Sequence, residues 1–518
     1  MAPISAASAA SASLEDAAAA TIVAMPAAGR HSYGQILKSS ALIGGSSVIN
    51  VAVSIARMKV MALLMGPAGV GLVGLYGSIL DLTQSIAGMG VNSSGVRQIA
   101  EAAGSGETQR VARTAAVLRW TSLLLGMMGA VLLIVFCRPL SQWTFNSDDH
   151  ATPVALLSLA VFFRAISDGQ GALIQGMRRI ADLARVAVLG AIFGTFVSIG
   201  LIYFFRRDGI VPSLVGVAGI SLVTSWWYRR RIPIPPASLK VSEFQYEARA
   251  LLKLGVAFMA TAVLTTGAAY AIRTLLGNTI GVEAAGLYQS AWALGGLYVG
   301  FILQAMGSDF YPRLTAVANN HPECNRLVNE QAHISLLLAG PGVLATLTFA
   351  PVVVAFFYDV TFIGAVQPLR WICLGMALRV VAWPMGYIIV AKGARNILIL
   401  TEIAAALVHV GLAFLLIARF GVDGATMAFC FLYVWHGILI YIIVRRLTGF
   451  RWSAANQRTG LIFIPTAGAV FVGFVVMPGP AAIAMGTLAA LASGFYSLRV
   501  ISGLVSFDRF PLARWLGV

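Results

Sequence analysis

The stretch from Leu63 to Ser78, LLMGPAGVGLVGLYGS, recurs from Leu275 to Ser290 as LLGNTIGVEAAGLYQS. One constant offset aligns the two stretches, and half of the aligned positions are identical. Self-similarity at a fixed offset marks a duplicated architecture. In a membrane protein, duplication produces two homologous lobes with a substrate path between them. The repeat therefore predicts a two-lobed protein, and transport is the first functional hypothesis.

The composition indicates a polytopic membrane protein of the all-α class. Of 518 residues, 58% are hydrophobic and only 11% are charged, whereas soluble domains carry about 25% charged residues. Long apolar runs recur between about residues 38 and 502, and many approach the ~20 residues that cross a bilayer. The net charge of +16 would suggest nucleic acid in a soluble protein. Here much of it lies in short loops between apolar runs, so we expect no nucleic-acid partner.

The apolar runs divide into about fourteen predicted spans of bilayer length. These are 38–64, 70–95, 112–136, 153–176, 185–205, 210–228, 250–275, 285–308, 332–358, 366–391, 397–418, 423–444, 460–477 and 481–500. Basic connections follow the even-numbered spans, and short or acidic connections follow the odd-numbered ones. Because basic loops stay in the cytoplasm, this alternation places both termini there.

The domain organisation follows from the repeat and from a basic, proline-containing connection after the sixth span. We predict a disordered cytoplasmic tail, an N-lobe of six spans, a cytoplasmic linker, a C-lobe of six spans and a two-span C-terminal extension. Their ranges are 1–35, 36–230, 231–248, 249–446 and 447–518. An even number of spans per lobe starts both lobes on the same side of the membrane, so the repeats are predicted to be parallel.

Arginines inside spans are the first candidate site residues, because an ionisable group in the bilayer normally faces a polar interior or a partner. Asn50 and Arg57 share one face of the first span, and Tyr270 and Arg273 share the matching face of the seventh. Each lobe thus presents an arginine on the corresponding helix. The alternative is that both arginines extend to the lipid headgroups and line no cavity.

Further candidates lie on other spans. Arg164 precedes Asp168 by one helical turn, which is also the spacing of an internal ion pair, and Arg379 occupies the position in the tenth span that matches Arg164. A cavity lined by arginine selects an anion, because guanidinium offers paired donors that match phosphate oxygens. The few intramembrane carboxylates are the ion-coupling candidates: Asp81, Asp168 and Glu402.

Nothing in the sequence predicts a cofactor, a metal site or an enzyme. The four cysteines, Cys137, Cys324, Cys373 and Cys430, show no metal-ligand spacing. No phosphate-binding loop of the GxxxxGK[ST] type is present, which argues against direct ATP hydrolysis. A membrane-bound polymerase or ligase is the enzymatic alternative. Such an enzyme needs a sizeable external loop for its catalytic groups, and every predicted external loop here is short.

Gly66-Pro67-Ala68-Gly69-Val70-Gly71-Leu72 and Gly281-Val282-Glu283-Ala284-Ala285-Gly286-Leu287-Tyr288 resemble the paired signatures of bacterial polysaccharide flippases. These flippases belong to the multidrug/oligosaccharidyl-lipid/polysaccharide (MOP) exporter superfamily. The resemblance covers about residues 36 to 446, and the branch of O-antigen and enterobacterial-common-antigen translocases is the most similar.

The resemblance implies two six-helix lobes that open alternately to each side of the bacterial inner membrane. The implied substrate is an undecaprenyl-pyrophosphate-linked oligosaccharide, such as an O-antigen unit for lipopolysaccharide, flipped from the cytoplasmic to the periplasmic leaflet. Arg57 and Arg273 match the cationic cavity residues of that family, and polysaccharide polymerase or chain-length proteins are the implied partners. The two extra spans are shared with lipid II flippases, so a lipid II flippase and a drug or ion antiporter of the same superfamily remain alternatives.

Overall fold

The computed structural model describes residues 28–104, 107–235, 241–305 and 310–504, and of residues 28–48 it describes the backbone alone. These residues form helices and no strand. Most of the predicted tail, and the last fourteen residues of the predicted extension, lie outside the described residues. Residues 28–35 of the predicted tail belong to the first helix.

The N-terminal half contains α2 (Ala28–Ala87), α3 (Val91–Gly104), α4 (Thr108–Val135), α5 (Cys137–Phe145), α6 (Ala151–Gly176), α7 (Ile180–Phe205), a 3-10 turn (Arg206–Gly209) and α8 (Ile210–Arg229). The C-terminal half contains α9 (Val241–Thr279), α10 (Val282–Ala305), α11 (Tyr311–Ala316), α12 (His321–Thr348), α13 (Ala350–Phe357), a 3-10 helix (Val360–Ala365), α14 (Val366–Ala391) and α15 (Arg395–Thr448). Two further helices follow, α16 (Ala454–Val476) and α17 (Gly479–Leu504).

Two long helices are each broken by one glycine. In α2 the break is at Gly66, with a φ of 64°, and in α15 it is at Gly421, with a φ of 60°. Glycine adopts this left-handed conformation without the steric cost that a Cβ brings. Pro67 then begins the second half of α2, a position where its missing N–H costs no helical bond. Each broken helix therefore supplies two of the predicted spans.

Within the described residues the predicted spans fall on helices, although the ends differ by several residues. The span 332–358 covers both α12 and α13, and residues 306–308 of the span 285–308 lie outside the described residues. The second span, predicted as 70–95, is interrupted after Ala87 by a turn in which Met89 and Gly90 have positive φ. Among the described residues, ten helical segments are long and apolar enough to cross a membrane, and three of them cover two predicted spans each. The helices are compatible with fourteen spans, and the prediction of an all-α polytopic membrane protein is confirmed.

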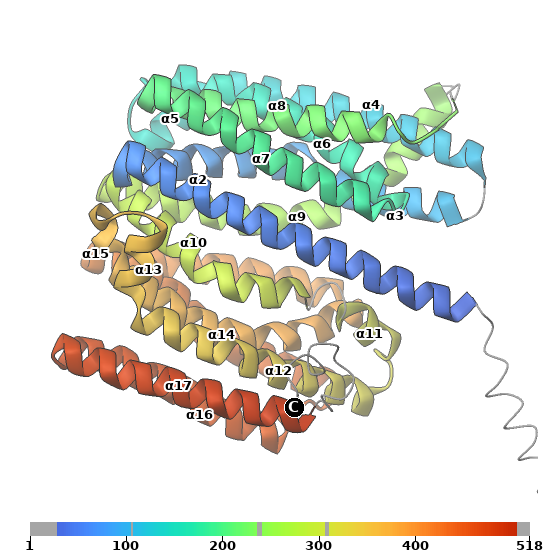
Figure 1. Ribbon diagram of the computed structural model, residues 1–518. Helices are drawn as coiled ribbons and strands as arrows, with labels where there is room; N and C mark the ends of the chain where they lie inside the picture. Colours follow the sequence, from blue (N-terminus) through green and yellow to red (C-terminus); the bar gives the residue numbers. More distant parts are fainter. Residues whose placement is uncertain (1–27, 105–106, 236–240, 306–309, 505–518) are drawn as a thin grey trace, which may run out of the picture.

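The helices form one elongated bundle with their axes in roughly the same direction (Figure 1). Helices α4 to α8 lie on one side and α12 to α15 on the other, with α2, α9 and α10 between them. In this middle layer α2 packs against both α9 and α10. Helices α16 and α17 are outermost and pack against α12. The middle layer is therefore where the two halves meet.

A polar network fixes α16 to the end of α15 and to α12. The Asn329 side chain on α12 accepts hydrogen bonds from the Ser453 backbone N–H (2.8 Å) and from the Asn456 amide (3.0 Å), and it donates to the Arg451 carbonyl (3.0 Å). Further along the bundle, the Arg370 guanidinium of α14 lies 3.8 Å from the ring centroid of Phe474 on α16. The terminal helix pair is thus attached at both ends of α16.

We expect Asn329→Leu to destabilise the protein by about 1–2 kcal/mol, because the partly buried Ser453 N–H loses its partner and the Asn456 amide loses one of its acceptors. The midpoint of thermal unfolding in detergent measures the effect. Gln457→Leu is the matched control, since Gln457 is exposed and bonds only to its neighbour Trp452. Equal midpoints for the two variants would show that the network does not hold α16 in place.

Candidate functional site

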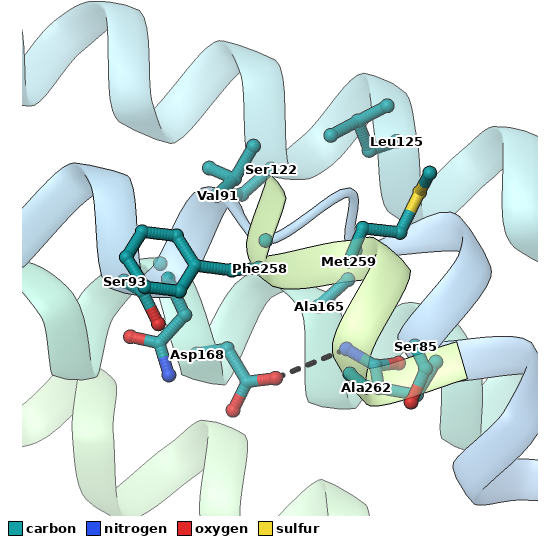
Figure 2. A pocket seen from close by; sticks show the side chains of 15 residues that line it. Ser85, Val91, Ser93, Ser122, Leu125, Ala165, Asp168, Phe258, Met259 and Ala262 are labelled. Carbon is teal, nitrogen blue, oxygen red and sulfur yellow. Dashed lines mark hydrogen bonds between the residues drawn. The ribbon is translucent and has the colours of Figure 1, made fainter. Parts of the chain in front are cut away.

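A cavity of about 270 Å³, lined by both polar and apolar side chains, lies where the two halves meet. Residues of α2, the following turn, α3, α4 and α6 form one wall, and Phe258, Met259 and Ala262 of α9 form the other (Figure 2). Its polar groups come from the first half: Gln84, Ser85, Asn92, Ser93, Ser122 and Asp168. The Gln84 amide donates to the Asp168 carboxylate over 3.0 Å, the bond drawn in Figure 2.

The halves touch on one side of this cavity through two glycines. Gly90 lies so close to Gly255 of α9 that a Cβ on either residue would overlap with backbone atoms of the other segment. Gly90 itself lines the cavity. A backbone-to-backbone contact of this kind is available only to residues without a side chain. We call it the Gly90–Gly255 contact.

The two copies of the sequence repeat make the second contact between the halves. A Cβ on Gly71 would overlap with the Val282 carbonyl, and a Cβ on Gly286 would overlap with the Pro67 carbonyl. We call this the repeat contact. A small residue of each copy thus lies directly against the backbone of the other copy.

Hydrogen bonds between the halves accompany these contacts. The hydroxyls of Thr144 on α5 and Tyr270 on α9 are 2.6 Å apart, and the Asn278 amide donates to the Trp143 carbonyl over 2.8 Å. Lys59 of α2 donates to the Ala355 carbonyl of α13 over 2.8 Å. The candidate substrate residue Tyr270 therefore takes part in joining the halves.

Each repeat tyrosine lies beside a basic side chain. The Tyr76 hydroxyl is 2.7 Å from His150 Nδ1, and the His150 ring stacks on Phe145 at 4.1 Å between centroids. His150 lies in the turn before α6, where burial lowers the pKa of its imidazole and Asp149 partly opposes that effect. The equivalent Tyr288 has the Arg273 guanidinium 5.9 Å from its ring centroid. Both tyrosines are therefore held by local partners.

Arg57 and Arg164 are brought together in the first half, within electrostatic reach of each other. Arg164 forms an ion pair with Asp81 of α2, with 2.8 Å between Nη1 and Oδ1. Among the described residues, Arg57 has neither a carboxylate partner nor a hydrogen bond. Arg57 is thus an unpaired cation beside a paired one.

The possible internal pair of Arg164 with Asp168 is not what the structure contains. Arg164 reaches across to Asp81, and Asp168 accepts from Gln84. The i, i+4 spacing placed both groups on one face of α6, but two polar groups on α2 face that same surface and take one partner each. The sequence could place Arg164 and Asp168 on one helix face, but it could not show which group each of them would bind.

Arg273 lies on α9 against α10. Its Nε donates to the Gln289 side chain over 2.8 Å and its Nη1 to the Ala269 carbonyl over 3.1 Å. A Cβ on Gly74 would come close to Gln289, so this pair sits next to α2. The Asn50 side-chain oxygen is buried and finds no partner within the described part of the chain. These two candidate substrate-binding residues, Asn50 on α2 and Arg273 on α9, are not bonded to each other.

Arg379 belongs to a separate group inside the second half. Its guanidinium lies 4.4 Å from the ring centroid of Trp383 and 5.7 Å from that of Tyr433. Glu402 and His436 are within electrostatic reach of it. The guanidinium Nε is buried and has no hydrogen-bond partner among the described groups. Glu402 is thus placed near a cation, away from Asp81 and Asp168.

None of the four arginines lines the cavity of Figure 2, so an arginine-lined cavity stays a prediction. Sequence reasoning placed Gln84 on one face with Asp81, but it missed Gln289 and the contacts made by the glycines. Gly71 and Gly286 carried a signal, because they belong to the repeat. Gly90 and Gly255 lie outside it and carried none.

Two helical lobes joined along a middle layer, with a cavity between them, are the architecture of the two-lobed class of membrane exporters. The model of one protein family, described as polysaccharide biosynthesis protein, matches residues 60–367. The chain belongs to this family.

Relatives and solved structures agree with this assignment. The lipid III flippases of Escherichia coli (strain K12) and Shigella flexneri are 23% identical to the chain over 408 residues, which is 77% of this chain and 95% of theirs. The structure is similar to lipid II flippase MurJ in an inward closed conformation, with a TM-score of 0.67, 12% identity and coverage of 89% of this chain and 99% of that one. An inward-facing multidrug resistance MATE transporter gives a TM-score of 0.65 with 15% identity, covering 80% and 96%.

The resemblance to polysaccharide flippases of the MOP superfamily is thereby confirmed, and so is the exporter fold. These relatives are transporters and flippases, so the chain is a multi-pass membrane transporter and not an enzyme.

Proposed function

We propose that the protein flips an undecaprenyl-pyrophosphate-linked oligosaccharide, such as an O-antigen unit, from the cytoplasmic to the periplasmic leaflet. One observation carries the proposal: Arg57 is a cation inside a predicted span that has no carboxylate partner among the described residues. An unpaired intramembrane charge is costly, so it points to a ligand of opposite charge. The likeness to lipid III flippases over nearly their whole length supports a lipid-linked substrate.

The physical need for such a protein is plain. Pyrophosphate and sugar hydroxyls cannot cross hydrocarbon unaided, because each buried charge or unpaired polar group costs several kcal/mol or more. A polar path between the lobes shields these groups while the lipid tail stays in the bilayer. Arg57, Arg164 and Arg273 are the proposed phosphate-binding residues, with Asn50 and Tyr270 as neutral partners and Arg379 as a second cationic group.

The transport cycle in this proposal separates the lobes alternately at the repeat contact and at the Gly90–Gly255 contact. The N-lobe spans 36–230 and the C-lobe 249–446, joined by the linker 231–248. The repeat contact is then the periplasmic closure, and both termini lie in the cytoplasm, because the Arg-rich loops are at the other end. Polysaccharide polymerase and chain-length proteins are the proposed periplasmic partners.

Asp81, Asp168 and Glu402 are the proposed ion-coupling groups. Asp81 holds Arg164 by an ion pair of 2.8 Å, and Asp168 lines the cavity with an oxygen bound by Gln84. Proton or Na⁺ binding at either carboxylate would weaken its hold on the neighbouring group. Ion binding would thus change the charge that the anionic substrate meets.

A flipping assay in proteoliposomes tests the proposal. We expect the protein to translocate undecaprenyl-pyrophosphate-linked oligosaccharide and to leave an organic cation such as ethidium untransported. An ionophore that collapses the proton or sodium gradient should slow the flipping if the carboxylates couple it. Transport of ethidium without flipping of the lipid would favour the antiporter alternative, and equal activity on lipid II would favour the lipid II branch.

A further inference from the structure

A second hollow lies within the N-lobe, and no residue of α9 lines it. It has a volume of about 420 Å³ and is lined only by residues of α4, α6 and α8. Ser122 and Gly169 line both this hollow and the cavity between the lobes, so they form the wall that separates the two. We call it the α4–α8 groove. It is distinct from the candidate site, because none of the proposed substrate or coupling residues lines it.

Two arginines, Arg119 of α4 and Arg229 of α8, line this groove. They lie within electrostatic reach of each other and repel. Within the described part of the chain, neither guanidinium has a carboxylate partner or a hydrogen bond. Two like charges that share a concave surface without a counter-charge favour binding of an anion. Guanidinium in particular matches the oxygens of a phosphate.

The remaining lining adds a neutral donor. The Gln170 oxygen accepts from the Ser225 hydroxyl over 2.7 Å, which fixes the amide in the groove. Its NH₂ group is left as a donor, since no hydrogen bond from it occurs among the described groups. The groove therefore presents donors and no acceptor carboxylate, the pattern expected for a phosphate-binding surface.

Exposed apolar side chains lie on the helices beside the lining of the groove. Trp120, Leu124 and Val223 are 51%, 55% and 57% exposed around it. The last residues of α8 and the two that follow it read Trp226-Trp227-Tyr228-Arg229-Arg230-Arg231, and the Arg230 guanidinium lies 4.5 Å from the Trp226 ring centroid. Tryptophan and tyrosine concentrate at the headgroup level of a bilayer, and clustered arginines attract anionic lipids.

We propose that the α4–α8 groove binds the phosphate headgroup of an anionic glycerophospholipid from the surrounding bilayer, with Arg119 and Arg229 as its ligands. The acyl chains lie along the exposed apolar rim. A zwitterionic headgroup fits less well, because its ammonium group would be brought near the two guanidinium groups. The inference does not depend on which lipid-linked sugar the protein transports.

The test measures lipid binding to the purified full-length protein by native mass spectrometry, with phosphatidylglycerol and phosphatidylcholine as probes. Near an anionic surface each arginine contributes roughly fivefold in affinity, so the Arg119→Gln/Arg229→Gln variant should bind phosphatidylglycerol about thirtyfold more weakly. Arg206→Gln/Arg207→Gln removes the same charge from the opposite end of α8 and should leave the affinity unchanged. The midpoint of thermal unfolding without lipid shows whether each variant is folded.

Three results would overturn the proposal. The first is unchanged phosphatidylglycerol affinity in the groove variant, and the second is phosphatidylcholine binding as tight as that of phosphatidylglycerol. The third is loss of undecaprenyl pyrophosphate binding with phosphatidylglycerol unaffected, which would assign the groove to the transported lipid. If the double variant fails to fold, Arg119→Lys/Arg229→Lys replaces it. Because this variant retains both positive charges, it should retain most of the affinity for phosphatidylglycerol, and high salt should reduce that affinity.

Discussion

Gly286→Ala is expected to reduce flipping by about tenfold or more, because the added Cβ overlaps with the Pro67 carbonyl at the repeat contact. Overpacking of a close contact costs about 1–3 kcal/mol. Separation of the two lobes at the repeat contact would relieve this strain. The substitution therefore shifts the protein toward the conformation in which the repeat contact is open. Since a cycle needs both states, a shift of this size makes the closed state rare.

The conformational shift has its own measurement. Cysteines introduced by Trp143→Cys and Asn278→Cys lie across the interface, where the native Asn278 amide bonds to the Trp143 carbonyl. A short crosslinker should join them in the otherwise native protein and much less in the Gly286→Ala background. Gly300→Ala is the matched control on the same helix, since a Cβ there meets no atom within 4 Å. If Gly286→Ala and Gly300→Ala gave equal crosslinking and equal transport, the repeat contact would not be a closure between the lobes.

The fold was predictable because its determinants are local. Apolar runs of bilayer length give the spans, and a half-identical repeat at one offset gives the two lobes. The helix ends were less predictable: an apolar pattern continues through the turn at Met89 and Gly90, where backbone conformation and not hydrophobicity breaks the helix. Likewise, only the structure distinguishes Gly66, where the helix breaks, from the other glycines of the repeat.

The candidate site was predictable only to the level of a helix face. Periodicity placed Arg164 and Asp168 together, and the structure keeps both on α6, but their partners Asp81 and Gln84 come from a helix whose distance is set by packing. The same limit explains Arg379, whose stacking on Trp383 follows from i, i+4 spacing whereas its contact with Tyr433 crosses from α14 to α15. The sequence thus shows which side chains share a helix face, whereas the pairing of side chains on different helices depends on how the helices pack.

Arg57→Gln is expected to weaken transport of a pyrophosphate-linked lipid by about 10- to 100-fold, the value of a lost hydrogen bond to a charged group. The same substitution should not lower the stability of the protein. Arg57 has no carboxylate partner in the described structure and is repelled by Arg164, so its removal relieves strain. We expect the midpoint of thermal unfolding to stay the same or to rise while flipping falls.

Arg164→Gln is the matched comparison, because it removes the same charge from the same cluster but leaves Asp81 without its 2.8 Å partner. This variant should lower transport but lower the unfolding midpoint only slightly, since the side chains of Arg164 and Asp81 are 37% and 57% exposed and an exposed ion pair contributes about 0–1 kcal/mol. Arg273→Gln should resemble Arg57→Gln in transport and lose its bond to Gln289. Full flipping by Arg57→Gln would mean that Arg57 extends to the lipid headgroups, and the anion-binding role would then pass to Arg164 and Arg273 alone.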